Sequence, residues 1–137
     1  MYWVDPFSAS NSVAASYGYD LVGNLQGMRY ANGVTNLYQY DARNRLTSLA
    51  WQSGGTALAS FAYTVGPTGN RTSLTETVGS GATPRAYNWA YDYLYRMTGE
   101  SIGGLGAVGY GFDTVGNRLS RSSNVSGISS NTAAYTA

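Results

Sequence analysis

Short runs of alternating apolar and polar residues fill this chain, and one such run recurs five times. It consists of two aromatic residues one position apart, in most copies an acidic residue directly after them, and a turn rich in Gly, Asn and Arg. Side chains two positions apart lie on one face of a β-strand, so each copy predicts a strand that ends in a turn. The copies begin 21 to 28 residues apart, at Tyr17, Tyr38, Phe61, Trp89 and Tyr110. Recurrence at this spacing is typical of a repeat protein.

A second strand is expected to follow each turn and to lead to the next copy. After the first turn, residues 24–30 run into Asn32-Gly33, a dipeptide that strongly favours a hairpin. Gly54-Gly55 has the same place after the second copy. No segment has a convincing helical pattern. The sequence therefore predicts an all-β fold, an array of antiparallel β-hairpins whose aromatic side chains form a ladder along one face of a continuous, twisted sheet.

The repeats divide the chain into three parts. Residues 1–16 are expected to form a leader or an edge strand, and residues 17–122 the five repeats. Residues 123–137 form a Ser/Asn/Gly-rich end. Tyr135 has the spacing of a sixth copy, which we expect to be truncated.

Composition argues against several classes of function. The chain has no Cys and no His, which removes disulfides, thiolate chemistry and the usual zinc sites, and we expect no cofactor. Eight basic and seven acidic residues give a net charge of +1, which supplies no broad attraction for nucleic acid. No stretch is apolar enough for membrane insertion, and the N-terminus lacks a signal-peptide pattern. Because Glu76 and Glu100 are isolated in the sequence, we also predict no enzyme.

Charged residues concentrate in the repeat turns. All eight basic residues are Arg, and four of them follow the aromatic pairs, at Arg45, Arg71, Arg96 and Arg118. Four acidic residues come directly after an aromatic pair, at Asp20, Asp41, Asp92 and Asp113. Such an Asp either accepts hydrogen bonds from its turn and pairs with a neighbouring Arg, or the four form a ladder of calcium ligands. We favour the structural role and expect no metal, because the Asp occurs once per repeat at a turn and the Arg comes with it.

The phrase Tyr-x-Tyr-Asp-x-x-Gly, followed by Asn or Arg and then Leu, resembles the YD repeat of the rearrangement hotspot (Rhs) family over residues 17–119. The resemblance implies hairpins wound into a spiral sheet that closes as a hollow shell. Family members include bacterial polymorphic toxins, cocoon-forming subunits of insecticidal toxin complexes, bacterial wall-associated proteins and animal teneurins. The third copy departs from the pattern, with Thr64 at the Asp position and two additional residues before Gly69.

By this resemblance, the aromatic residues pack within the sheet, and the Asp and the Gly-Asn/Arg of each copy fix the turn. The structural repeat residues are Tyr17, Tyr19, Asp20, Gly23, Tyr38, Tyr40, Asp41, Arg45, Phe61, Tyr63, Gly69, Arg71, Trp89, Tyr91, Asp92, Arg96, Tyr110, Phe112, Asp113 and Gly116.

These observations predict a structural β-repeat segment, either part of a toxin-encapsulating shell or a scaffold that assembles into a filament or ring. Its partners would be copies of itself or further YD repeats of a larger chain. The resemblance implies a bacterial protein that is extracellular or at the cell surface. The alternative is a cell-surface adhesion or glycan-binding module; its contact residues would be Trp3, Trp51, Tyr87 and Tyr93, which lie outside the phrase or off its alternation. A remnant of a toxin gene is a third interpretation.

Overall fold

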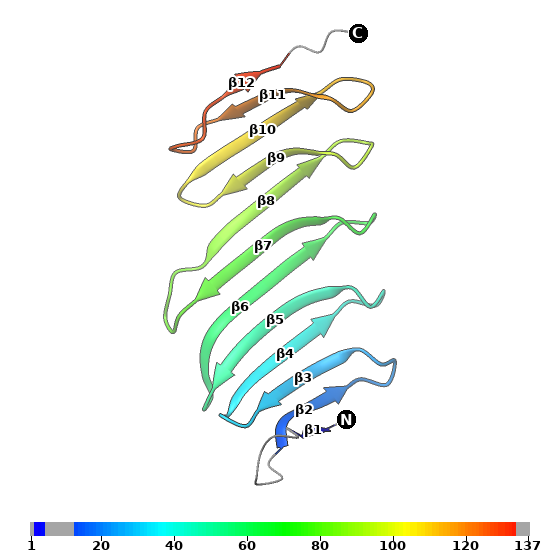
Figure 1. The fold of residues 1–137 in the computed structure, drawn as a ribbon, viewed down its shortest axis with the longest axis vertical. Helices are drawn as coiled ribbons and strands as arrows, with labels where there is room; N and C mark the ends of the chain where they lie inside the picture. Colours follow the sequence, from blue (N-terminus) through cyan, green and yellow to red (C-terminus); the bar gives the residue numbers. More distant parts are fainter. Residues whose placement is uncertain (1, 5–12, 134–137) are drawn as a thin grey trace. The chain divides into compact units, whose positions relative to one another are not determined.

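The computed structural model describes residues 2–4 and 13–133, and these residues contain strands and turns but no helix. The predicted all-β fold is confirmed, and Figure 1 shows a succession of antiparallel hairpins. The strands are β1 (Tyr2–Val4), β2 (Val13–Tyr19), β3 (Leu25–Tyr30), β4 (Val34–Tyr40), β5 (Leu46–Ser53), β6 (Thr56–Val65), β7 (Arg71–Val78), β8 (Arg85–Tyr91), β9 (Met97–Ile102), β10 (Gly106–Phe112), β11 (Arg118–Ser123) and β12 (Asn131–Thr132).

The chain divides into two compact units. Unit 1 comprises Met1–Tyr63 and Thr75–Pro84, and unit 2 comprises Thr64–Leu74 and Arg85–Ala137. Within unit 1, strands β1 to β6 pair in chain order, and every pair is antiparallel. Within unit 2, strands β8 to β12 pair in the same way. The repeat turns of each unit therefore lie at one end of its strands, and the connections between repeats lie at the opposite end (Figure 1).

A register shift precedes four of the repeat turns. It falls directly before the second aromatic residue of the phrase, at Tyr19, Tyr40, Tyr91 and Phe112. A bulge of this kind adds one unpaired residue and increases the local twist of the hairpin. The extra residue lies in the strand after the turn, at Gln26, Thr47, Thr98 and Leu119.

The connections between repeats form where the sequence predicts them. Gly33 has φ 84° and donates its N–H to the carbonyl oxygen of Tyr30 at 3.0 Å. Gly54 and Gly55 have φ 55° and 81° between β5 and β6. These backbone conformations favour glycine, which explains why Gly marks the chain reversals.

Few side chains of the described residues are buried. Ala15, Ala59 and Val108 are the buried apolar residues, at 5%, 5% and 6% exposure, and Asn36 is the buried polar one, at 8%. No described side chain falls below 2% exposure. Sheets that pack against a second layer bury one face more deeply than this. The core of each unit is therefore a layer of half-buried side chains.

Candidate functional site: the repeat turns and the aromatic face

The five repeat turns share one backbone hydrogen-bond pattern. They are turn 1 (residues 20–24), turn 2 (41–45), turn 3 (66–70), turn 4 (92–96) and turn 5 (113–117). In each turn, the N–H of the first residue donates to the carbonyl of the fifth, and the N–H of the fourth donates to the carbonyl of the first. In turn 1 these distances are 2.9 Å from Asp20 to Asn24 and 3.2 Å from Gly23 to Asp20.

The fourth residue of every repeat turn has a positive φ. The values are 94° at Gly23, 58° at Asn44, 97° at Gly69, 61° at Tyr95 and 100° at Gly116. A left-handed residue at this place closes a three-residue hairpin loop with a twist that matches the flanking strands. The fourth position therefore favours Gly, and turns 2 and 4 accept strain there.

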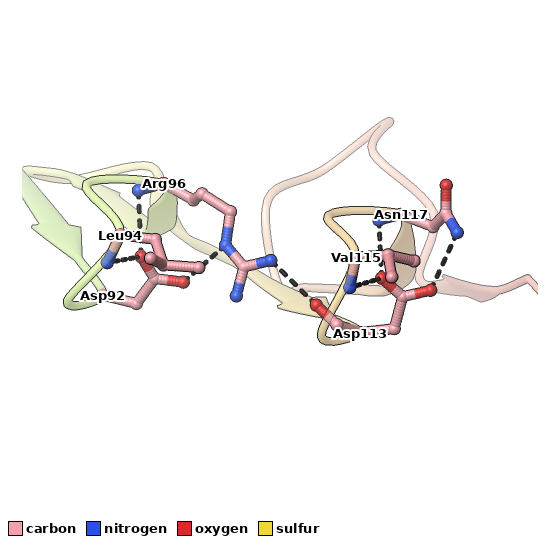
Figure 2. A network of polar contacts seen from close by, with 6 residues as sticks. All are labelled: Asp92, Leu94, Arg96, Asp113, Val115 and Asn117. Atoms are coloured by element: carbon pink, nitrogen blue, oxygen red, sulfur yellow. Dashed lines mark hydrogen bonds and ion pairs between the residues drawn. The ribbon is translucent and has the colours of Figure 1, made fainter.

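The repeat aspartates bind their own turns with both carboxylate oxygens (Figure 2). Oδ1 of Asp92 accepts the N–H of Leu94 at 2.9 Å and of Arg96 at 3.0 Å, and its Oδ2 accepts Arg96 Nε at 2.7 Å. Oδ1 of Asp113 accepts the N–H of Val115 at 3.0 Å and of Asn117 at 2.7 Å, and its Oδ2 accepts Asn117 Nδ2 at 2.8 Å. Asp20 and Asp41 make the same three contacts. This geometry accounts for the recurring Asp by turn structure, without a ligand.

The same contacts lower the pKa of all four carboxyl groups. For Asp41 the largest influence is the hydrogen bond from the backbone of Arg45, which lowers the pKa. For Asp20, Asp92 and Asp113 the largest single influence is desolvation, which raises the pKa. The hydrogen bonds from the fifth turn residue and from the other turn residues lower the pKa, and together they outweigh the desolvation. The carboxylates are thus ionised at neutral pH and act as fixed acceptors.

Turn 3 follows the common backbone pattern although it lacks the Asp. Gly66 donates its N–H to the carbonyl of Asn70 at 2.9 Å, and Gly69 donates to the carbonyl of Gly66 at 3.1 Å. The hydrogen bonds therefore align Gly66 with the repeat aspartates, two residues later than Thr64, the position suggested by the sequence. The two additional residues extend β6, which is 10 residues long, and leave the turn unchanged.

The four predicted turn arginines occupy two different positions. Arg45 and Arg96 are fifth turn residues and form ion pairs of 2.7 Å with Asp41 and Asp92. Arg71 and Arg118 lie one residue later, at the start of the following strands. In their turns the fifth residue is Asn, as it is in turn 1 at Asn24. The predicted turn motif includes these Asn residues, but the predicted site residues do not.

The aromatic residues gather on one face of each unit's sheet. Residues directly opposite one another in a ladder share a face. In unit 1, one row of such partners crosses β2 to β6 through Tyr17, Met28, Asn36, Trp51 and Ala59. In unit 2, the row through Trp89 continues to Glu100, Val108 and Ser123. We call these surfaces the aromatic faces of the units. The opposite face of unit 2 carries small residues, as in the row Ala90, Gly99, Gly109 and Ser122.

Aromatic rings contact one another within each unit. Trp51 meets Phe61 edge to face, with ring centroids 5.8 Å apart and planes at 69°. Tyr87 stacks on Trp89 along the same strand at 6.3 Å and 16°. Trp89 also donates its indole N–H to Glu100 Oε1 at 3.0 Å. These aromatic contacts lie within the aromatic faces.

The residues proposed as glycan contacts do not form one platform. Trp51 and Tyr87 belong to the aromatic faces of different units. Tyr93 lies at the tip of turn 4 and is 83% exposed. The side chain of Trp3 lies outside the described residues. Structure also reveals exposed apolar turn tips that sequence reasoning missed, with Leu21 and Val115 at 107% and 81% exposure; the signal for them is their place at the second and third turn positions.

A polar cleft of about 390 Å³ lies beside turns 1 and 2. Its lining includes Asp20, Asn24, Tyr40, Asp41 and Asn44. Asn24 Nδ2 donates to Asp20 Oδ2 and to Asn44 Oδ1, both at 2.9 Å, so its amide joins the two turns. Both carboxylates are engaged in their turns. The described residues contain no group of three or more acidic side chains arranged to hold a metal ion.

None of the described residues belongs to a helix that is long and apolar enough to cross a membrane.

Comparison with known proteins agrees with the repeat geometry. The sequence model of the RHS repeat matches residues 19–50, which span turns 1 and 2. No curated protein matches the chain. The Tc holotoxin pore of Photorhabdus luminescens has a similar fold, with a TM-score of 0.65 and 18% identity. The crystal structure of TcdB2-TccC3-TEV has a TM-score of 0.66 at 18% identity, and that of TcdB2-TccC3-Cdc42 has 0.68 at 20% identity.

In all three comparisons the match covers 82% of this chain but 7% of the solved chain. The protein thus corresponds in length to a small part of those structures, and at this identity the likeness concerns the fold. Residues 19–50 thus match the RHS repeat, and most of the chain shares the fold of these toxin structures.

Proposed function

We propose that this chain is a wall segment of an Rhs-type shell and that its hairpins continue into further YD repeats. The observation that carries the proposal is the exposure of the aromatic faces. Tyr30 and Trp51 on the face of unit 1 remain 39% and 40% exposed, and no described side chain is fully buried. A single sheet with an uncovered apolar face lacks the second layer that normally stabilises it. In a closed shell, one face of the wall is separated from bulk solvent, which suits such a surface.

The chemistry of the turns supports an architectural role. Both oxygens of each repeat Asp are occupied by donors of the same turn, as Asp92 illustrates. A catalytic carboxylate instead needs an oxygen that can reach a substrate and a pKa close to the working pH. The pKa of Asp92 is lowered from its ordinary value. We therefore assign the repeat residues to the scaffold and propose no enzymatic activity.

The toxin-related structures support the same proposal through their fold. Their chains share the hairpin arrangement over 82% of this sequence. We extend to this chain the role of enclosing a toxin, and with it a location outside the cell or at its surface. Its partners are then further YD repeats, of the same polypeptide or of another copy.

Dye binding and mass measurement in solution test the proposal. The purified 137-residue chain should bind the apolar dye ANS or self-associate as its concentration rises, because its aromatic faces lack a cover. Size-exclusion chromatography with light scattering measures the second effect. A well-folded monomer at all concentrations that binds no ANS would show that the chain covers its own aromatic residues, and it would contradict a wall segment.

Glycan binding is the competing function, and the exposure of Tyr93 is the observation that favours it. A glycan array with the protein and its Tyr93→Ala and Trp51→Ala variants separates the two functions. A shell segment gives no selective signal. A signal that disappears in either variant, while circular dichroism shows an intact fold, supports the adhesion module instead.

A further inference from the structure

The turn sequences alternate between two types along the chain. Turns 1, 3 and 5 end in Gly-Asn, and we call them odd turns. Turns 2 and 4 end in Asn44-Arg45 and Tyr95-Arg96, and we call them even turns. Every even turn therefore pairs the long, forked side chain of Arg with a fourth residue that is not Gly. This alternation is not part of the common hairpin pattern, so it needs its own explanation.

Arg96 of even turn 4 reaches forward to odd turn 5 (Figure 2). Its Nε holds Asp92 Oδ2 at 2.7 Å, while its Nη1 donates to the carbonyl oxygen of Asp113 at 2.8 Å. Its guanidinium carbon lies 4.8 Å from the centroid of the Phe112 ring. The planar guanidinium allows these contacts at the same time, because its donors point in several directions within one plane. In turn 5 the corresponding Asn117 is shorter and donates to Asp113 of its own turn.

Tyrosine hydroxyls connect the even hairpins backward to odd ones. Tyr91, the residue before turn 4, donates its hydroxyl to the carbonyl of Arg71 at 2.9 Å. Tyr40, the residue before turn 2, donates to the carbonyl of Leu25 at 3.0 Å. Both acceptors occupy the same position, directly after an odd turn. The pKa of Tyr40 is raised, chiefly by desolvation and further by Tyr38 and Asp20, so its hydroxyl keeps the proton that it donates.

The contact between turns 1 and 2 follows the same rule. Asn24 of the odd turn donates its side-chain amide to Asn44 Oδ1 of the even turn at 2.9 Å. The acceptor belongs to the fourth position, where odd turns carry Gly and have no side chain to offer. In the contacts described here, the even hairpin contributes Tyr40, Tyr91, Asn44 or Arg96.

We infer that the even turns are clasps that set the order of hairpins in the array. Each even hairpin holds the odd one before it through Tyr, and turn 4 holds the odd one after it through Arg96. Two odd hairpins placed side by side would have neither the guanidinium nor an acceptor at the fourth turn position. A hairpin that adds beside an odd turn is therefore selected by the Arg at its fifth turn position, together with a Tyr directly before its turn. The Arg is the distinguishing residue, because odd turn 1 is also preceded by a Tyr, Tyr19. This inference holds for any array built from the chain, whether or not it closes as a shell.

Amide hydrogen exchange, measured by NMR on the full chain, tests the clasp at turn 5. The reporter is the N–H of Gly116, which donates to the same Asp113 oxygen as Arg96. In Arg96→Gln this amide should exchange about tenfold faster, the size expected when a hydrogen bond from a charged donor is lost. Arg121→Gln is the matched control, because Arg121 binds Ser129 instead of a turn, and it should leave Gly116 unchanged.

A conservative variant and a second site keep the test decisive. Arg96→Lys keeps the charge beside Asp92 but lacks the fork, so it should accelerate Gly116 while turn 4 stays protected. Faster exchange in turn 4 alone, with Gly116 unaffected in both Arg96 variants, would overturn the clasp. If Arg96→Gln does not fold, Tyr91→Phe tests the contact of turn 4 with turn 3, which Tyr91 makes through the carbonyl of Arg71. The Gly69 amide of turn 3 should exchange about threefold faster in this variant than in the Tyr93→Phe control. Equal exchange in these two variants would also overturn it.

Discussion

Replacing Gly116 by Ala should destabilise unit 2 even though the added methyl group meets no other atom. Gly116 has φ 100°, and a Cβ placed on it has no neighbour within 4 Å, so the effect comes from the backbone alone. The left-handed conformation costs an L-residue about 1–2 kcal/mol. The lower entropy of alanine in the unfolded chain returns about 0.4–1 kcal/mol. The free energy of unfolding should therefore fall by about 1 kcal/mol.

A substitution at the fourth residue of turn 4, Tyr95→Gly, should instead raise the free energy of unfolding. Tyr95 has φ 61° and is 59% exposed, so Tyr95→Gly relieves backbone strain and removes little packing. The relief of about 1–2 kcal/mol is partly offset by the greater entropy of unfolded glycine, about 0.5–1 kcal/mol. A net gain of about 0.5–1 kcal/mol should result.

Thermal unfolding followed by circular dichroism measures both effects. For a chain of 137 residues, 1 kcal/mol shifts the midpoint by about 3 °C if unfolding is a single transition, and by about 7 °C if unit 2 unfolds separately. Gly18→Ala is the control, because Gly18 lacks a positive φ and its Cβ would also meet no atom within 4 Å. An unchanged midpoint in Gly116→Ala, or a lower one in Tyr95→Gly, would refute the assignment of strain to the fourth turn position.

Two further predictions concern the turn carboxylates and the thin core. The pKa of Asp92 is lower in the folded than in the unfolded state, so its stabilising contribution is complete above about pH 4 and is lost as the pH falls through the folded pKa. Asp92→Asn should therefore reduce the fall in thermal stability between about pH 5 and 2. The same fall in the variant and the original protein would contradict this prediction. Val108→Ala, at 6% exposure, should lower the free energy of unfolding in urea by about 1.6 kcal/mol, from about 0.8 kcal/mol for each of two buried carbon groups, whereas Val115→Ala, at 81% exposure, should change it by less than about 0.5 kcal/mol. Equal losses in the two valine variants would contradict the burial that separates them.

Local sequence chemistry was sufficient to predict the hairpins. The alternation of aromatic residues sets the face of each strand, and the positive φ of Gly33 and Gly116 explains why Gly marks the reversals. The position of turn 3 was harder to predict. The aromatic spacing suggested Thr64 as the first turn residue, whereas the backbone hydrogen bonds place Gly66 there. Where the repeat loses its Asp, the spacing of strands no longer locates the turn.

Contacts between hairpins could not be predicted from one repeat. Arg96 appeared to be a partner of its own Asp92, and that ion pair is present at 2.7 Å. Its second hydrogen bond, to the carbonyl of Asp113, depends on the lateral distance between neighbouring turns, which the sequence does not contain. The exposure of the aromatic faces could not be predicted from the sequence either. An aromatic pattern predicts that a face is buried but does not indicate what buries it.

Electron microscopy of the native protein that carries these repeats tests the shell function most directly. The protein can be isolated from its source cells with an antibody raised against this chain and imaged in negative stain. The shell proposal predicts closed, hollow particles. Filaments or open rings would contradict a closed shell and favour the self-assembling scaffold, and compact solid monomers would contradict both.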